Sequence, residues 1–324
     1  MFLSDFARKN LLIEFQRILS RAANKAIYDA KGKPTEPHLT KEIASQIPNG
    51  LYDALTSYIH GYEFEVHAIF CHQFPYVTFV DEPNKKCELG DLLFIYSEEG
   101  KDKGNALLLQ AKKIKDSKFL PKDNEKTQLA LYTKSPEFTY TLSNSEIRKI
   151  PNDENFNGAQ YLLLFPPYDC DCQYRSVLPA IVKTPSLANT DFFADKLLCL
   201  FSDEGIGKFE ISQDTTDDWS KIIQDFIKRR NLNKNVMDNL ERRDFSCGSH
   251  NLYKVDNFDD EKISETSVEI VTNQYGTAIY YILQKSDLLL DNPNINNNTG
   301  EKVKPFLIVY INAKKRKERA EYNV

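Results

Sequence analysis

The 324-residue chain has few of the features that mark membrane or secreted proteins. No apolar run approaches the roughly 20 residues needed to span a bilayer. The start, MFLSDFARKN, lacks the long apolar region of a secretory signal. The six cysteines are scattered along the chain, which disfavours a disulfide framework. These absences predict a soluble, cytoplasmic protein with no membrane segment, and no internal repeat is visible.

The chain also lacks an excess of positive charge: acidic residues outnumber basic ones, and the formal net charge is −5. This balance disfavours a protein that coats nucleic acid nonspecifically. A nuclease stays open, because only a local cleft has to be positive. Two local basic clusters exist: Lys112, Lys113, Lys115, Lys118, Lys122 and Lys126, and the tail residues Lys314, Lys315, Arg316, Lys317 and Arg319. We interpret the tail as a solvated terminus.

Two short runs combine residue types that bind metals. Cys170 and Cys172 are separated by one residue, whereas zinc knuckles use two or more. His67, Cys71 and His72 fall in a predicted strand, where alternation places Cys71 and His72 on opposite faces. We interpret both runs as ordinary core or surface residues.

Hydrophobic periodicity divides the chain into helices and strands. Residues 2–29 predict an N-terminal helix with Ser4 or Asp5 as its N-cap. Residues 40–60 predict two short helices separated at Pro48. Later elements are predicted as strands at 64–80 (broken at Pro75), 89–96, 105–113 and 159–165, helices at 123–134 and 216–230, a hairpin at 268–283 and a strand at 306–311.

The order of these elements from 40 to 165 is α-β-β-β-α-β. We therefore predict an α/β (α+β) fold with a mixed sheet. Its parts are an N-terminal helix at 1–39, a core at 40–170 and a C-terminal α/β extension at 171–324.

The stretch from Glu88 to Lys113 carries the most chemistry. Two apolar strands flank a polar turn, so Asp91 at the start of the first strand lies beside the end of the second. Gln110 and Lys112 are two apart on that second strand and point to one face, while Ala111 points away. The preceding residues, Leu107, Leu108 and Leu109, indicate a buried strand. Polar residues at the end of a buried strand need partners, and Asp91 is the obvious one.

This constellation suits a hard divalent cation and a phosphodiester. Mg²⁺ prefers oxygen ligands, which Asp91, the Gln110 amide and the backbone carbonyl of Ala111 can offer. Lys112 would orient the attacking water or stabilise developing charge. A Mg²⁺ site with a single carboxylate ligand would bind weakly, so we expect a further acid from among Glu88, Glu63, Glu65 and Glu14. Glu88 would need a bend at Gly90 to face Asp91. The competing interpretation is structural: Asp91 caps a turn or forms a buried salt bridge with Lys112 without metal.

At these residues the sequence resembles the PD-(D/E)xK nuclease superfamily, in its QxK, Mrr-like branch. Asp91 matches the first motif residue, and Gln110-Ala111-Lys112 matches the QxK variant of the second, although Gly90 stands where a proline is expected. Gln128 resembles an accessory polar residue that some members place beside the site. The resemblance implies a restriction-endonuclease-like core, Mg²⁺ or Mn²⁺ as cofactor and DNA as substrate. It also implies a role in anti-phage defence or restriction, often beside a partner ATPase or another defence subunit.

Two hypotheses follow from these residues. In the first, the protein is a Mg²⁺-dependent endodeoxyribonuclease with Asp91, Gln110 and Lys112 as its catalytic residues. In the second, it is an inactive nuclease-fold subunit that binds nucleic acid or protein, because Gln110 replaces an acid. A regulatory or scaffold component is a third, weaker class, and homo-oligomerisation stays open.

Overall fold

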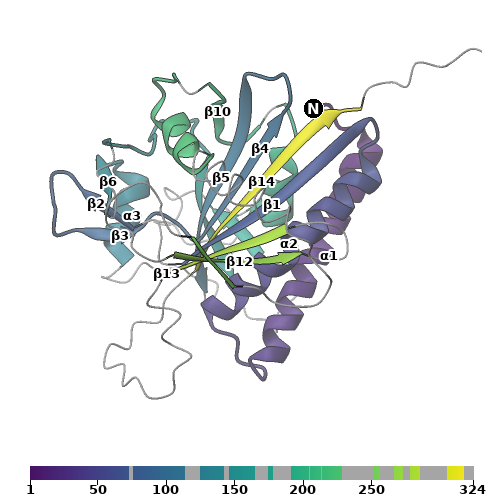
Figure 1. Cartoon of the computed structure of the whole chain (residues 1–324), viewed down its shortest axis with the longest axis horizontal. Helices are drawn as coiled ribbons and strands as arrows, with labels where there is room; N and C mark the ends of the chain where they lie inside the picture. The colour runs from purple at the N-terminus through teal and green to yellow at the C-terminus, as the bar shows by residue number, and fades with distance from the viewer. Residues whose placement is uncertain are drawn as a thin grey trace, which may run out of the picture.

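A computed structural model of the chain describes most of its N-terminal two thirds and several C-terminal strands (Figure 1). The described residues are 1–72, 76–113, 125–141, 146–164, 174–177, 191–203, 205–212, 214–227, 252–255, 266–272, 278–284 and 305–316. Seven of the cysteine and basic residues named above lie outside them: Cys170, Cys172, Lys115, Lys118, Lys122, Lys317 and Arg319. Pro75, the predicted strand break, also lies outside.

Two long helices form the N-terminal part. Helix α1 (Asp5–Asp29) begins as predicted, because the Ser4 hydroxyl accepts a hydrogen bond from the Ala7 N–H at 3.2 Å. Helix α2 (Glu36–Tyr58) continues through Pro48, so the predicted division into two helices is wrong. Packing explains the difference: α2 buries an apolar face, and a Cβ added to Gly50 would lie 2.4 Å from the Ile18 side chain on α1. Packing against α1 therefore favours one continuous helix, although an interior proline costs about 3 kcal/mol.

The large sheet is mixed, as predicted. Its centre runs in the order β1-β14-β4-β5-β7. These strands are β1 (Tyr62–His72), β14 (Pro305–Lys315), β4 (Leu92–Glu98), β5 (Lys103–Lys113) and β7 (Ala159–Leu164). Strand β14 is antiparallel to β1 and parallel to β4, and β5 is antiparallel to β4 and parallel to β7.

The position of β14 differs from the predicted organisation. Residues 306–311 are predicted to belong to a C-terminal extension, yet β14 lies between two strands of the predicted core. Ile308, Val309 and Ile311 are buried there, facing both sides of the sheet. The sheet therefore crosses the predicted boundary at residue 170.

Shorter strands extend the sheet or form a second one. The large sheet also contains β8 (Tyr174–Val177), β9 (Asp191–Phe192), β10 (Lys208–Glu210), β11 (Leu252–Val255), β12 (Thr266–Thr272) and β13 (Ala278–Gln284). Strands β12 and β13 pair antiparallel, which confirms the predicted hairpin. A second sheet has the order β3-β2-β6, from β2 (Tyr76–Phe79), β3 (Lys86–Glu88) and β6 (Phe138–Tyr140). The predicted strand 64–80 thus divides into β1 and β2, which belong to different sheets.

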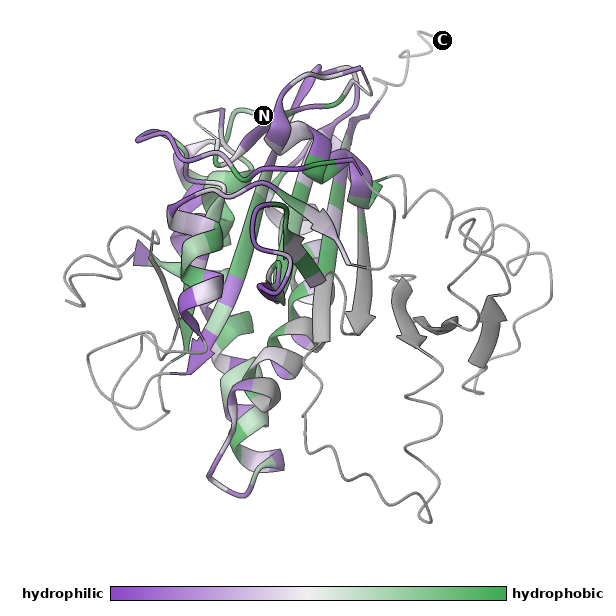
Figure 2. Cartoon of the chain, turned by 90° about the vertical axis from the view of Figure 1, so that its left-hand side faces the viewer, coloured by the Kyte–Doolittle hydropathy of each residue, from purple (hydrophilic) through white to green (hydrophobic). Residues whose placement is uncertain are grey.

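Two apolar layers sandwich the large sheet (Figures 1 and 2). Helices α1, α2 and α4 (Phe193–Leu200) pack on one face. Helix α3 (Lys126–Thr133), the helical residues 218–227 and the small sheet pack on the other. Strand β5 follows the predicted alternation, with Leu107, Leu109 and Ala111 toward the first layer and Leu108 toward the second. None of the described helices combines the length and hydrophobicity that crossing a membrane requires.

Gly207 provides a test of how the α3-side layer contacts the sheet. Its φ is +53°, and an added Cβ would lie 2.1 Å from the backbone oxygen of Ala106 on β5. Gly100 also has positive φ, +81°, but has no atom within 4 Å of such a Cβ. Gly100→Ala should therefore cost only the backbone term of about 1 kcal/mol. Gly207→Ala should cost about 2 kcal/mol more, measured by urea unfolding through the fluorescence of the single tryptophan, Trp219. Equal losses in the two variants would show that Ala106 and Gly207 are not in close contact.

Candidate functional site

Asp91 lies where the β4–β5 ladder ends. The chain reaches this point through Gly90, where an added Cβ would lie 2.7 Å from a Leu108 methyl group. The Asp91 N–H donates to the Leu109 carbonyl at 2.8 Å. Its Oδ2 accepts the Ala111 N–H at 2.6 Å. Because β4 proper begins only at Leu92, the Asp91 side chain continues the hydrogen bonding of β5 beyond the backbone ladder.

Gln110 and Lys112 point to the same face of β5, as the alternation predicts. The Gln110 amide nitrogen donates to Asp91 Oδ2, and its Oε1 accepts from Gln128 Nε2 on α3. The Lys112 ammonium lies 3.3 Å from Glu125 Oε1, at the N-terminal end of the same helix. Gln110 is fully buried and Lys112 is 5% exposed. The three predicted catalytic residues therefore lie at one end of the β4–β5 hairpin, under α3.

The predicted metal ligands also come together, with one difference in orientation. Gln110 Nε2 contacts Asp91 Oδ2 and lies 3.5 Å from the Ala111 carbonyl oxygen. Asp91 and the Ala111 carbonyl are oxygen donors of the kind Mg²⁺ prefers. Gln110 fits the same donor set only after its amide turns, because its nitrogen faces these oxygens. Within the described residues, no three His, Cys, Asp or Glu side chains form a group that could hold a metal ion.

The four acids proposed as an additional metal ligand lie in three different parts of the fold. The Glu88 carboxylate, at the end of β3, accepts a hydrogen bond from the Tyr76 hydroxyl at 3.3 Å, while its backbone carbonyl accepts from Gln128 at 3.2 Å. Glu63 and Glu65 lie near the start of β1, where β1 pairs with the C-terminal end of β14. That end of β14 pairs in turn with the end of β4 at Glu98. Glu63 and Glu65 are therefore at the opposite end of the sheet from Asp91. Glu14 lies on α1 and pairs with Arg17 at 2.6 Å.

Two acids that the sequence analysis missed lie close to the QxK segment. Glu125 pairs with Lys112. It stands three residues before Gln128, and this helical spacing could have revealed that both face β5. Glu36, at the start of α2, accepts the backbone N–H of Lys113 at 2.9 Å. No local pattern indicates this second contact, because 77 residues separate the partners.

Two tyrosines close the apolar side of the site. The Tyr132 hydroxyl donates to the Leu89 carbonyl, and its ring packs edge-on against Tyr161 with centroids 5.6 Å apart. Burial, and then the neighbouring Tyr161 and Asp91, raise the pKa of Tyr132 well above its ordinary value. Burial likewise raises the pKa of Tyr161, helped by Glu125. Both phenols therefore stay neutral at physiological pH.

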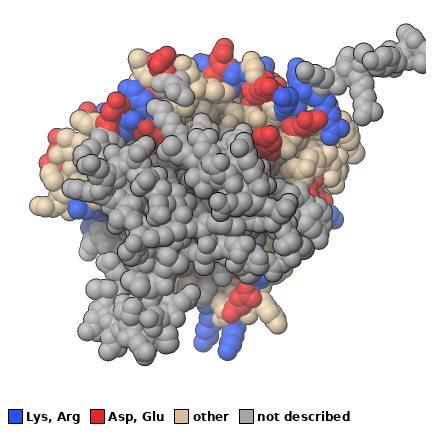
Figure 3. Space-filling model, viewed as in Figure 1, with Lys and Arg blue, Asp and Glu red and all other residues tan. Residues whose placement is uncertain are grey.

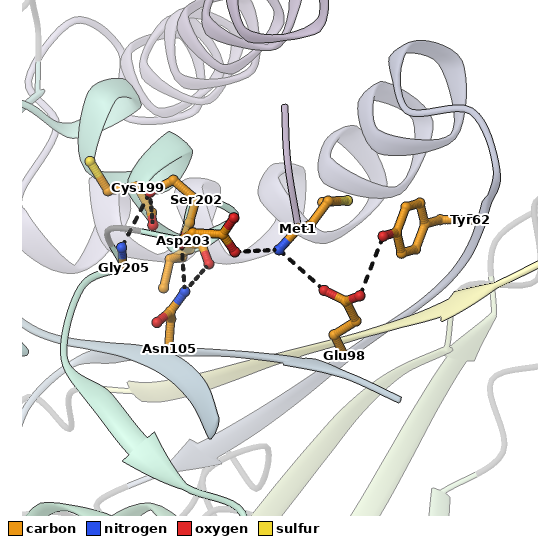
Figure 4. A network of polar contacts seen from close by, with 9 residues as sticks. Met1, Tyr62, Glu98, Asn105, Cys199, Ser202, Asp203 and Gly205 are labelled. Atoms are coloured by element: carbon orange, nitrogen blue, oxygen red, sulfur yellow. Dashed lines mark hydrogen bonds and ion pairs between the residues drawn. The ribbon is translucent and has the colours of Figure 1, made fainter. Parts of the chain in front are cut away.

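A second polar cluster lies at the far end of the hairpin (Figure 4). The Met1 amine contacts Glu98 at 3.2 Å and Asp203 at 3.0 Å, and the Tyr62 hydroxyl donates to Glu98. Asn105 donates to the Leu200 carbonyl at 2.7 Å. A cavity of about 360 Å³ beside it has mixed charge in its lining, which includes Glu98, Lys101, Lys103, Asp203 and Lys208. The described surface in Figure 3 is similarly mixed, with Lys and Arg interspersed among Asp and Glu.

Cys87, on β3 beside the site, gives a pH-dependent prediction. Burial, and then the Glu88 charge, raise the pKa of its thiol from 9.0 to about 12. The folded state therefore keeps a proton that the unfolded chain releases, so stability falls as pH rises from about 9 toward 12. The expected slope from this residue is about 1.4 kcal/mol per pH unit.

Cys87→Ala should remove this slope. The difference in unfolding free energy between wild type and Cys87→Ala should change by about 2 kcal/mol between pH 7.5 and pH 10.5. Urea titrations at both pH values measure it. A difference that does not depend on pH would contradict the burial of this thiol.

Comparison of the chain with family models, curated proteins and solved structures finds no match. The described site offers a buried carboxylate, two amides, a lysine–glutamate pair and a backbone carbonyl at one end of a hairpin.

Proposed function

We propose that the chain is a metal-dependent DNA endonuclease that hydrolyses phosphodiester bonds. The observation that carries the proposal is the placement of Asp91, Gln110 and Lys112 at one end of β4 and β5. The order α2, β1, β4, β5, α3, β7 supports a restriction-endonuclease-like core, with β14 inserted between its first two strands. The sequence resemblance adds a role as effector of an anti-phage defence or restriction system to the proposal.

The residues divide the chemistry between them. Asp91, the Ala111 carbonyl and a turned Gln110 amide would hold Mg²⁺ or Mn²⁺, with Glu88 the nearest of the predicted acids along the chain. Such an ion, when bound, neutralises charge on the phosphate and activates a water. The water oxygen bonds to phosphorus, the bond to the leaving oxygen breaks, and that oxygen takes a proton. Lys112 would donate hydrogen bonds to the attacked phosphate, and Glu125 holds its ammonium in place.

A second function keeps the nuclease fold without catalysis. The Gln110 amide turns its nitrogen, and not its oxygen, toward Asp91. In that arrangement the Asp91 carboxylate already accepts hydrogen bonds from the Gln110 amide and the Ala111 N–H. The chain would then act as a module that binds nucleic acid or protein.

Substitutions of Asp91 and Lys112 separate these functions. Asp91→Asn keeps an oxygen for the Ala111 N–H but loses the charge that anchors a cation. Lys112→Ala removes the ammonium near the phosphate. Each should lower Mg²⁺-dependent nicking of supercoiled plasmid by at least about 100-fold.

Lys103→Ala is the matched control, on the same strand but at the opposite end of the hairpin. It should nick at the wild-type rate, and chelation by EDTA should stop all nicking. Cleavage by Lys112→Ala at the wild-type rate would exclude this site. A wild-type protein that binds DNA but never cleaves it would favour the second function.

Glu125→Gln tests the role of the lysine–glutamate pair. Glu125 pairs with the Lys112 ammonium, so we assign it as a positioning residue for Lys112. We expect kcat to fall about tenfold, with Mn²⁺ affinity unchanged, because the cation ligands are intact. Glu63→Gln, at the other end of the sheet, should change neither quantity. An unchanged kcat in Glu125→Gln would show that Lys112 needs no partner for its role.

A further inference from the structure

Two glutamine amides form a continuous chain between two acceptors beside the proposed metal site. Gln128 Nε2 donates to the Glu88 backbone carbonyl at 3.2 Å and also to Gln110 Oε1. Gln110 Nε2 in turn donates to Asp91 Oδ2. Both glutamines are buried, Gln110 fully and Gln128 at 6% exposure.

The chemistry of the two ends sets the direction of this chain. A backbone carbonyl only accepts hydrogen bonds, and the Asp91 carboxylate accepts here from both Gln110 and Ala111. Gln128 must therefore turn its NH₂ group toward Glu88, and one of its hydrogens then serves Gln110 Oε1. Because the Gln110 oxygen accepts this hydrogen bond from Gln128, the Gln110 NH₂ group faces Asp91. Both acceptors thus require the same direction of hydrogen bonding along the two amides, and the Gln128 and Gln110 NH₂ groups each donate to an acceptor.

We infer that Gln128 is a positioning residue that holds the Gln110 amide nitrogen in the place of the cation. The inference rests on the proposed metal site. Gln110 Nε2 reaches Asp91 and lies 3.5 Å from the Ala111 carbonyl, so it contacts the two oxygen ligands that would share the ion with Gln110. It supplies there the partial positive charge that a metal ion would supply in full.

Cation binding then requires the Gln110 amide to turn by half a rotation. Its oxygen would face the ion, and its NH₂ group would face the NH₂ group of Gln128. The contact between the two glutamines is lost, and Gln128 cannot turn in response without facing the Glu88 carbonyl with its own oxygen. Gln128 therefore lowers the affinity of the site for a cation. A residue that merely supported a metal ligand would have the opposite effect.

The sign of this effect can be measured directly. Gln128→Met keeps the length of the side chain but removes both donors. In the full chain it should bind Mn²⁺ about tenfold more tightly than wild type by titration calorimetry, equivalent to about 1.4 kcal/mol. Gln128→Ala, which leaves room for a water, should shift the affinity in the same direction and serves if the methionine variant is unstable.

Gln160→Met is the matched control. Gln160 is buried, like Gln128, and donates to the Asn157 carbonyl at 2.7 Å. Its neighbours on β7, Ala159 and Tyr161, lie on the α3 side of the sheet. Because side chains alternate along a strand, Gln160 lies on the opposite face of the sheet from Gln110. Its Mn²⁺ affinity should equal that of wild type. Gln110→Glu is the positive control, because a second carboxylate beside Asp91 should bind Mn²⁺ tightly.

The outcomes separate the inference from the proposed function. Tighter binding in Gln128→Met with no change in Gln160→Met supports the inference. Equal or weaker binding in both Gln128 variants, with measurable binding in wild type, overturns the inference and leaves the proposed metal site in place. No binding in wild type, in the Gln128 variants and in Gln110→Glu overturns the proposed metal site, and the inference with it.

Discussion

The buried carboxylate of Asp91 is the constraint around which this end of the molecule is arranged. It lies where the backbone ladder between β4 and β5 stops, and it accepts the N–H of Ala111 that β4 no longer reaches. Burying a charge without partners would be costly, and Gln110 supplies a second donor. Through Gln128 and the Glu88 carbonyl, the same interaction ties α3 and the small sheet to β5.

The hydrogen bonds that stabilise buried Asp91 compete with the binding of a metal ion. The donors that compensate Asp91 lie where a cation would contact the same oxygens, so a bound metal would have to replace a hydrogen bond that the fold already makes. Lys112 does not stand alone either, because Glu125 holds its ammonium. The site is thus a network of largely buried polar contacts, in which the orientation of the Gln110 amide decides whether it presents a nitrogen or an oxygen to Asp91.

Local patterns predicted much of this site. Alternation along β5 placed Gln110 and Lys112 on one face and Ala111 on the other. Helical periodicity found α1 and the helix that carries Gln128. The prediction failed at Pro48, where packing of α2 against α1 overrides the local preference of proline. It also missed Glu125, although the spacing to Gln128 was available in the sequence.

The sequence by itself determined the hairpin, the face that carries its polar residues and the mixture of helices and strands, because each depends on periodicities of two to four residues. Only the tertiary structure decided that β14 lies at the centre of the sheet, where Tyr310 bonds with Ser97, 213 residues away, at 2.7 Å. It also decided the partner of Lys112 and the direction of the two amides. Such pairings depend on which surfaces meet after the chain has folded, and no local repeat encodes them.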